Sequence, residues 1–438
     1  MSRRLFRELK APLRAFIEVT GNCNLGCKHC YNYWRDLGNQ LDCSTAKHMT
    51  EKLAERVIGQ IIDNEVFSVC LSGGEPLTNY NVVKLILKRC HGTKNKVTMN
   101  SNVTLLTEQR LDELMSLGLS AIYTTVLGSS PFIHDTITGV VGSFERTILG
   151  IELCHRKGMP ISTNTVVTKR NINDIFATAE MLKRIGCESM SIDIASCPFN
   201  CSDFSDYALG RDEQIKLLND IAIIDNTMGI KARKATPIPY CVFPELDDFS
   251  KCLDSNCTAG TFSCTIGSDG QLRACPLTAN NVGSIVKYDL LTLWEKFTEW
   301  RTDEFIPDSC RDCKLLYRCG ARCRLGGHQV TSQMDCANLL MNADSAELAY
   351  ELLKMHNQKT FRQMQMSGQI TFSDFVLRLE KFGAVVWDGF QLQLIDAKGV
   401  KIFQTLTPKA TYNVDEIMFP GYESFFRDLI TSGLATIN

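Results

Sequence analysis

Short apolar runs alternate with amphipathic stretches along the first part of this chain. Six runs have the length and composition of buried strands, at residues 15–20, 68–73, 96–102, 121–127, 161–167 and 189–195. Between the strands, apolar residues recur at helical spacing, at residues 45–64, 80–90, 107–118, 143–157 and 172–186. Thr107 has the side chain of a helix N-cap. Strand-helix units in series predict a parallel sheet, curled into a barrel or opened as a doubly wound sheet.

Chemically distinctive residues stand where these strands end. They comprise a cysteine loop at Cys23–Cys30, the segment Gly73–Pro76, Asn100 to Asn102, and Asn164. The carboxyl ends of parallel strands form one rim of a barrel or sheet, where active sites lie. The pattern therefore places these residues around one site.

The pattern changes after Cys197, where loops rich in Pro, Asp, Ser and Cys begin. We expect a basic arm at residues 1–14, a barrel at 15–230, a cysteine-rich domain at 231–343 and an α+β extension at 344–438. In the extension the pattern predicts helices to about residue 366, at 372–382 and at 421–433, with an alternating hairpin at 383–406.

Composition narrows the function classes. The 438 residues are 44% hydrophobic with a net charge of −2, and Lys and Arg form no basic stripe. Nothing favours a nucleic-acid surface or an anionic membrane. No apolar run approaches the roughly 18 residues of a membrane span, and the basic opening lacks the apolar core of a signal peptide. We therefore expect a cytoplasmic protein, in which clusters among the 20 cysteines bind metal and no disulfide framework forms.

The first metal motif is Cys23-x3-Cys27-x2-Cys30, followed one strand later by SGGEP at residues 72–76. Three thiolates on a short loop can hold three irons of a [4Fe-4S] cube and leave the fourth iron open. Zinc is the alternative, but a structural zinc site normally has a fourth ligand. An ordinary strand-helix turn is the alternative for SGGEP.

In this order these motifs resemble the radical S-adenosylmethionine (radical SAM) superfamily, over about residues 12–200, with His29 before the last cysteine in its usual place. The resemblance implies a partial (β/α)6 barrel of the TIM type. It also implies that SAM binds the open iron and is cleaved to a 5′-deoxyadenosyl radical. Besides His29, the residues it assigns to SAM are Gly73, Gly74, Glu75, Pro76, Asn100, Asn102, Thr125 and Asn164. For the Asn and Thr side chains, satisfaction by neighbouring backbone is an equal alternative.

A second motif follows the barrel, and its eight cysteines resemble a SPASM domain with two auxiliary [4Fe-4S] clusters. The resemblance assigns Cys257, Cys264, Cys275 and Cys323 to one cluster, and Cys310, Cys313, Cys319 and Cys336 to the other. Cys252 is an alternative to Cys257. A zinc ribbon is the alternative for the Cys310–Cys323 segment. Full ligation by four thiolates leaves no open iron, so these clusters would serve electron transfer or structure.

Nine cysteines remain outside both motifs. Those in strand or helix settings, such as Cys70 and Cys154, are expected to be small buried hydrophobes. Cys197, Cys201 and Cys241 follow the sixth strand near the expected substrate entrance, where one could donate a hydrogen atom or accept a thioether. A plain loop cysteine is the favoured interpretation for each. Asp193 is a possible proton acceptor or a core residue.

The combined resemblance implies an oxidoreductase that abstracts hydrogen from a ribosomally made peptide or protein and modifies it oxidatively. Residues 124–144 resemble the corresponding stretch of peptide maturases, whereas sulfatase maturases carry an arginine near Thr138. A flavodoxin or ferredoxin would supply low-potential electrons. The extension could capture a peptide by strand addition. The alternatives are a dehydrogenase or epimerase of a small molecule such as an amino sugar, a sulfatase-maturase-like enzyme, and a non-catalytic electron carrier.

Overall fold

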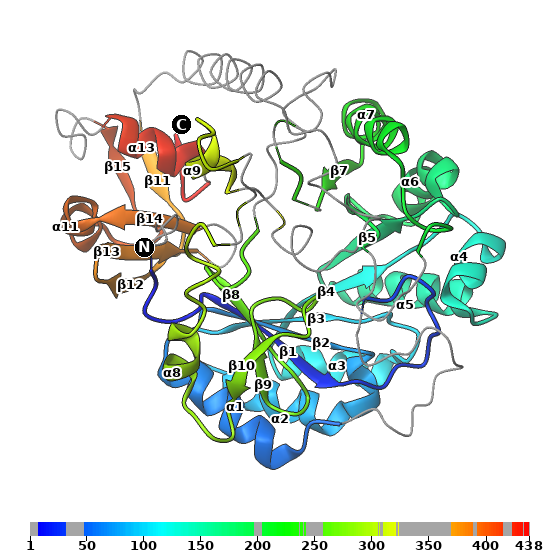
Figure 1. The fold of residues 1–438 in the computed structure, drawn as a ribbon, viewed down its shortest axis with the longest axis horizontal. Helices are drawn as coiled ribbons and strands as arrows, with labels where there is room; N and C mark the ends of the chain where they lie inside the picture. Colours follow the sequence, from blue (N-terminus) through cyan, green and yellow to red (C-terminus); the bar gives the residue numbers. More distant parts are fainter. Residues whose placement is uncertain are drawn as a thin grey trace. The chain divides into compact units, whose positions relative to one another are not determined.

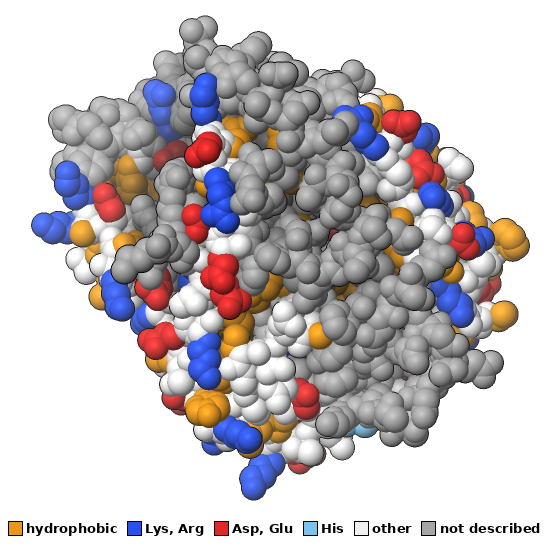
Figure 2. Space-filling view, in the orientation of Figure 1, with side chains coloured by type: hydrophobic (Ala, Val, Ile, Leu, Met, Phe, Trp, Pro, Cys, Tyr) orange, Lys and Arg blue, Asp and Glu red, His pale blue; other side chains and the backbone are white. Residues whose placement is uncertain are grey.

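The protein is described from a computed structural model, which defines residues 8–31, 48–196, 204–235, 237–239, 241, 257–304, 306, 310–320, 323, 369–388, 392–414, 423–431 and 433–437. The chain separates into two compact units, Met1–Leu352 and Leu353–Asn438. On the face drawn in Figure 2, the described Lys and Arg side chains are interspersed with Asp and Glu.

The first unit is built on parallel strands in sequential order, as the apolar runs predict. The sheet passes from β1 to β7 without a break in order, and each strand pairs in parallel with the next. The strands are β1 (Arg14–Thr20), β2 (Ser68–Gly73), β3 (Lys96–Asn100), β4 (Leu119–Thr125), β5 (Ile161–Val167), β6 (Ser189–Ile194) and β7 (Lys231–Lys234). The six predicted strands and the parallel sheet are confirmed.

Helices cover the outer side of this sheet (Figure 1). They are α1 (Glu51–Asp63), α2 (Tyr80–Cys90), α3 (Glu108–Ser116), α4 (Pro131–Thr138), α5 (Ser143–Lys157), α6 (Ile175–Arg184) and α7 (Arg211–Thr227), with short 3-10 turns η1 (Pro76–Asn79) and η2 (Ile172–Asp174). The hydroxyl of Thr107 accepts a hydrogen bond from the Arg110 amide at 3.3 Å, so the predicted N-cap is confirmed. Val57 and Ile61 on α1 are fully buried, as the apolar face of the helix requires.

The cysteine-rich segment continues the same sheet. Strand β8 (Ser263–Ile266) pairs in parallel with β1, and β9 (Gln271–Arg273) and β10 (Asn281–Ser284) follow in antiparallel order. The full order is β10-β9-β8-β1-β2-β3-β4-β5-β6-β7. Two short helices follow, α8 (Leu290–Glu295) and α9 (Leu316–Cys319). The strand that leads into the cysteine loop is therefore interior to the sheet.

A buried ion pair reinforces this junction. The Arg273 guanidinium of β9 donates to the Glu18 carboxylate of β1, and both side chains are almost completely buried. Arg273 also donates to the carbonyls of Pro276 and Thr278, at 3.4 and 3.2 Å. Multiple hydrogen bonds are what a buried guanidinium needs to offset its lost hydration.

The second unit has its own core, to which Phe372, Phe403 and Phe426 contribute buried rings. Its strands form two small sheets, in the orders β15-β11-β16 and β12-β13-β14. The elements are β11 (Gln369–Phe372), β12 (Val376–Glu380), β13 (Gly383–Trp387), β14 (Leu392–Asp396), α11 (Ala397–Thr405), β15 (Thr411–Asn413), α13 (Glu423–Thr431) and β16 (Ala435–Ile437).

The extension is α+β as predicted, but two of its elements differ from the prediction. The predicted helix at 372–382 is wrong, because residues 376–380 form strand β12. The hairpin predicted at 383–406 ends early, at Asp396. The Asp396 carboxylate accepts hydrogen bonds from the Lys398 and Gly399 amides and so caps the start of helix α11. The last predicted helix is confirmed as α13. The helix predicted over 344–366 lies outside the described residues.

The buried pair yields a stability prediction. Arg273→Met leaves the Glu18 carboxylate buried without its cation, so the unfolding free energy should fall by about 3–5 kcal/mol in anaerobic urea titrations. The double variant Glu18→Gln/Arg273→Met should regain more than half of that loss. Lys10→Met is the matched control, because the Lys10–Glu65 pair is exposed and is worth about 1 kcal/mol or less. Equal losses in the single and double variants would contradict the assignment.

Candidate active site and auxiliary cysteine sites

The cysteine loop follows β1 and lies against two other loops of the barrel rim. The Gly26 amide donates to the Thr138 carbonyl at 2.7 Å, and the Lys28 amide donates to the Ile137 carbonyl at 3.2 Å. Asn102, beyond β3, donates to Asn24 at 2.8 Å and lies 3.9 Å from the Cys23 sulfur. The loop is therefore shaped by partners far away in sequence. Backbone hydrogen bonds thus fix the conformation of the segment that carries the cysteines.

The end of α4 that receives this loop is itself braced. The Asp135 carboxylate accepts from the Gly142 amide at 2.6 Å, from the Phe144 amide at 2.8 Å and from the Ser143 hydroxyl at 2.8 Å. These bonds hold the pKa of Asp135 below its usual value, against the opposing effect of burial. An ionised Asp135 thus fixes the turn between α4 and α5, and this turn fixes the carbonyls that bind the cysteine loop.

Gly73 and Gly74 are required by the chain's own backbone. Gly73 has φ +123°, and a Cβ there would lie 2.1 Å from the Thr20 carbonyl oxygen. A Cβ on Gly74 would lie 2.2 Å from the Asn22 carbonyl oxygen. The Gly74 and Glu75 amides donate to these same two carbonyls, at 2.8 and 2.7 Å. The glycines therefore let the ends of β1 and β2 meet at the root of the cysteine loop.

Glu75 is a buried support for the neighbouring loop. Its carboxylate accepts from the Leu77 amide at 3.0 Å, the Ser101 hydroxyl at 2.8 Å and the Asn102 amide at 2.7 Å. Burial raises the pKa of Glu75 to about 7, although the three hydrogen bonds oppose the shift. Pro76, the next residue, begins η1. Glu75 thereby positions Asn102, which reaches the cysteine loop.

The remaining predicted SAM residues lie at adjacent strand ends. Thr125 on β4 pairs in register with Asn164 on β5. The Asn164 amide donates to the Asp193 carboxylate at 3.3 Å, whereas its Oδ1 is buried and accepts no hydrogen bond among the described residues. A buried acceptor without a donor is a place where a ligand hydroxyl or amine gains a hydrogen bond. Asn100 accepts a weak bond from the Cys70 thiol at 3.3 Å.

Other polar residues beside the loop were not predicted from the sequence. His29, which the resemblance assigns to SAM, is buried, and Tyr31 follows the last cysteine. Burial raises the pKa of Tyr31, and the nearby Cys30 and Glu18 raise it further, while a hydrogen bond with Ser72 lowers it. Glu18 lies on a strand whose pattern indicates only burial, so its ion pair with Arg273 has no signal in the sequence.

Three of the four cysteines assigned to the first auxiliary site, Cys257, Cys275 and Cys323, interact electrostatically. Burial raises the pKa of the Cys275 thiol, and Cys257 and Cys323 lie near enough to raise it further. Cys264 is fully buried on β8, where burial alone raises its pKa to about 12. The alternative ligand Cys252 lies outside the described residues.

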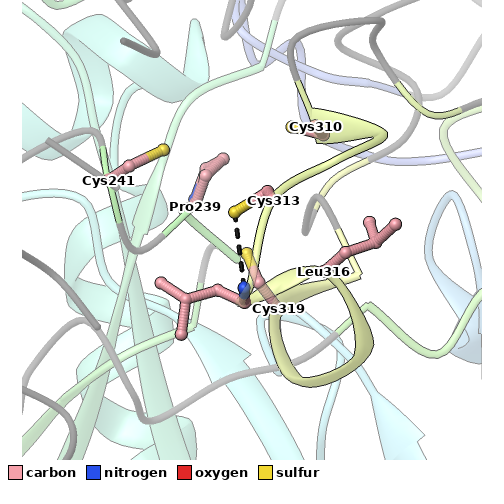
Figure 3. Close-up of a pocket in the computed structure, with 7 residues that line it drawn as sticks. Pro239, Cys241, Cys310, Cys313, Leu316 and Cys319 are labelled. Carbon is pink, nitrogen blue, oxygen red and sulfur yellow. Dashed lines mark hydrogen bonds between the residues drawn. The ribbon is translucent and has the colours of Figure 1, made fainter. Parts of the chain in front are cut away.

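Three of the cysteines assigned to the second auxiliary site border one cavity. Cys310, Cys313 and Cys319 line one small cavity, and Cys241 lines the same cavity (Figure 3). Cys336 lies outside the described residues, as do Cys197 and Cys201. No three His, Cys, Asp or Glu side chains of the described residues stand close enough together to hold a single metal ion. Within the same residues no helix is long and apolar enough to cross a bilayer.

Comparison with known families matches both motifs. Residues 17–182 match the radical SAM superfamily, and residues 257–314 match the SPASM iron-sulfur cluster-binding domain. The chain is a radical SAM enzyme with a SPASM domain. In this radical SAM/SPASM protein the loop with Cys23, Cys27 and Cys30 follows β1, and β8, which contains Cys264, pairs with β1 in the same sheet.

Relatives of this radical SAM enzyme act on different classes of substrate. An AdoMet-dependent heme synthase of Methanosarcina barkeri is 28% identical over 73% of this chain and 93% of its own. A PqqA peptide cyclase of Ruegeria pomeroyi is 23% identical over 78% and 94%. In structure, Streptococcus suis SuiB bound to its precursor peptide SuiA aligns with a TM-score of 0.59 at 19% identity, over 72% of each chain. That likeness shows the shared fold.

The residues present fit the cofactors that the two domains imply, SAM and [4Fe-4S] clusters. Cys23, Cys27 and Cys30 supply three thiolates on one loop, and the buried Oδ1 of Asn164 offers an acceptor to a polar ligand. When bound, a three-thiolate cluster supplies an electron that cleaves SAM. The surrounding residues hold the cysteine loop through the hydrogen bonds described above.

The contacts of Gly74 yield a testable prediction. Gly74→Ala must push the Asn22 carbonyl away, because the added Cβ would lie 2.2 Å from its oxygen. We expect the variant to lose most of the SAM-dependent change in the electron paramagnetic resonance (EPR) signal of the reduced cluster.

Gly59→Ala is the matched control for this substitution. Gly59 lies in α1 with no atom within 4 Å of an added Cβ, so its signal should be unchanged and its helix more stable by about 1 kcal/mol. A normal signal in Gly74→Ala would show that the close approach does not position the loop.

Proposed function

We propose that this radical SAM enzyme abstracts a hydrogen atom from a peptide or protein and modifies it oxidatively. The observation that carries this proposal is the second unit, Leu353–Asn438, a compact body with its own core beyond the catalytic unit. Hydrogen abstraction at the barrel rim does not require such a unit, whereas a long flexible substrate must be held at a distance from the reacting bond. The PqqA peptide cyclase relative supports the same substrate class.

A small molecule is the second candidate substrate. The M. barkeri heme synthase has the higher identity, 28% against 23% for the peptide cyclase, and this chain covers 93% of its length. A compact substrate with carboxylates would call for a closed pocket with matching cations. The predicted amino-sugar alternative belongs with this candidate. A sulfatase-maturase-like enzyme is a separate alternative that acts on a protein, and the same assay tests it with sulfatase peptides.

We assign the following roles within the proposed function. Cys23, Cys27 and Cys30 hold the SAM-binding cluster, and His29, Gly73, Gly74, Pro76, Asn100, Asn102 and Thr125 shape its surroundings. Asn164 accepts a hydrogen bond from SAM, and Asp193 orients the Asn164 amide at 3.3 Å. Glu75 positions the loop of Asn102 rather than contacting SAM, since its oxygens already accept three bonds.

Two auxiliary clusters complete the proposed set of three. The Cys257, Cys275 and Cys323 group holds the first with Cys264, and the Cys310, Cys313 and Cys319 group holds the second. Abstraction of one hydrogen atom leaves a substrate radical, so an oxidised product requires the loss of a second electron. The auxiliary clusters would accept that electron, and a flavodoxin or ferredoxin would supply the first one to the SAM-binding cluster.

Peptide recognition can use the edge of a sheet in the second unit. In the described residues β12 has a single strand neighbour, β13, and so forms one edge of its sheet. The Leu379 side chain of β12 is 56% exposed. An extended peptide pairing with such an edge gains backbone hydrogen bonds and a contact for an apolar side chain.

Anaerobic turnover tests the proposed function. The reconstituted protein is incubated with SAM, dithionite and candidate precursor peptides, and 5′-deoxyadenosine and peptide mass are followed together. We expect peptide-stimulated 5′-deoxyadenosine with the loss of two hydrogens, about 2 Da, from the peptide for a crosslink. Stimulation by tetrapyrrole carboxylates or amino sugars, with every peptide inert, would favour the small-molecule candidate.

Removal of the second unit tests its role in recognition. Deletion of residues 353–438 should weaken peptide binding at least tenfold in a fluorescence titration, because the β12 edge is lost. The SAM-dependent EPR change should persist, since the first unit is compact by itself. Unchanged peptide affinity in the truncated protein would exclude the second unit from recognition.

A further inference from the structure

Strand β7 presents two cations on the inner face of the sheet. Lys231 and Arg233 are exposed, whereas Ala232 and Lys234, which alternate with them, are 0% and 2% exposed. Helix α7 packs against β7 on the outer side of the sheet (Figure 1). Successive side chains of a strand point to opposite faces. The two buried residues therefore face the helices, and Lys231 and Arg233 face the inner side.

Arg233 stands in one register row with residues that we assign to the surroundings of SAM. Thr125 of β4 pairs with Asn164 of β5, Asn164 pairs with Ser191 of β6, and Ser191 pairs with Arg233 of β7. Residues paired across neighbouring strands share one face of the sheet. Adjacent strands lie about 4.8 Å apart, so the backbones of Asn164 and Arg233 are separated by about 10 Å along the row.

This part of the inner face is open. Tyr123 on the inner side of β4 is 45% exposed. In the row itself Asn164 and Ser191 are half-buried and Arg233 is exposed. On the opposite side of the same sheet Ile192 is 1% exposed, because helices cover it. The inner face therefore has room for a ligand beside Ser191 and Arg233.

The Arg233 guanidinium is available to such a ligand. No ion pair or hydrogen bond joins it to any of the described residues. The Asp193 carboxylate on the neighbouring strand accepts a hydrogen bond from the Asn164 amide at 3.3 Å. A guanidinium is always charged, and its planar fork of donors matches a carboxylate with two parallel hydrogen bonds. The chemistry of this position thus favours a carboxylate ligand.

We propose that Arg233 binds a carboxylate of the substrate on the inner face of the sheet, beside bound SAM. The inference rests on the proposed function, in which Asn164 accepts a hydrogen bond from SAM and hydrogen is abstracted from a substrate next to it. A substrate that continues the row beyond Asn164 meets Ser191 and then Arg233. An acidic side chain or the carboxyl terminus of a peptide supplies the required group, and so does a tetrapyrrole carboxylate.

Binding to the full-length, reconstituted and SAM-loaded protein tests this assignment with two pairs of probes. One pair is a short dye-labelled peptide rich in glutamate and the same peptide with glutamine at those positions. The other pair is coproporphyrin and its methyl ester. In at least one pair the wild-type protein should bind the carboxylate form about tenfold more tightly or better, and Arg233→Gln should abolish that preference.

The two pairs separate the possible sources of the carboxylate. A preference in the peptide pair supports a peptide substrate. A preference confined to the porphyrin pair, and lost in Arg233→Gln, supports the role of Arg233 while it contradicts the peptide substrate of the proposed function. Equal affinities within both pairs, or a preference that survives in Arg233→Gln, would overturn the assignment.

The strand supplies its own matched control. Lys231 lies on the same face at the start of β7, where it pairs with Ser189, so Lys231→Met should keep the full preference. Arg233→Lys retains the charge without the planar fork and should keep only part of it. The SAM-dependent EPR change should be normal in every variant. Its loss in Arg233→Gln would assign the residue to SAM and exclude the substrate role.

Discussion

The position of β1 inside the sheet is the constraint on which the catalytic unit depends. One edge of β1 pairs with β2 and the other with β8, so the strand that leads into Cys23 cannot shift without disturbing both the barrel and the SPASM strands. The buried Glu18–Arg273 pair adds a charge-specific link between β1 and β9, two residues before Cys275. A single strand thus sets the position of the SAM-binding motif and of the first auxiliary site.

The buried cysteines can carry a thiolate only when a metal ion stabilises its charge. Burial raises the pKa of Cys241 and of Cys264 to about 12, so these thiols stay protonated at neutral pH without iron. A bound iron reverses this preference, since its charge stabilises the thiolate that the apolar surroundings disfavour. The Asp135 and Glu75 carboxylates have a structural role. They accept hydrogen bonds from backbone amides and so shape the loops around the first motif, while the cysteines remain available to bind metal.

Much of this architecture could be predicted from the sequence, because its signals are local. Apolar runs bounded by helical periodicity predicted all six strands, and the spacing of Cys23, Cys27 and Cys30 predicted the first site. The errors also have local causes: residues 376–380 have enough apolar spacing to suggest a helix, and Asp396 caps a helix inside an apparently alternating stretch. The approach of Cys241 to Cys313, and that of Arg273 to Glu18, could not be predicted. Each joins segments separated by many residues, and neither Cys241 nor Arg273 belongs to a motif with a distinctive spacing.

The pairing of β1 with β8 also determines when the sheet can be completed during protein synthesis. Phe16 lies opposite Thr265 in the parallel register, so about 250 residues must be made before the second edge of β1 finds its partner. At the usual rates of protein synthesis this takes roughly ten to fifty seconds. During that interval the nascent barrel presents an open strand edge and three unligated thiols beside it. When β8 pairs with β1, the open edge of β1 is covered. The completion of the sheet therefore also protects the nascent barrel from aggregation and the three cysteines from oxygen.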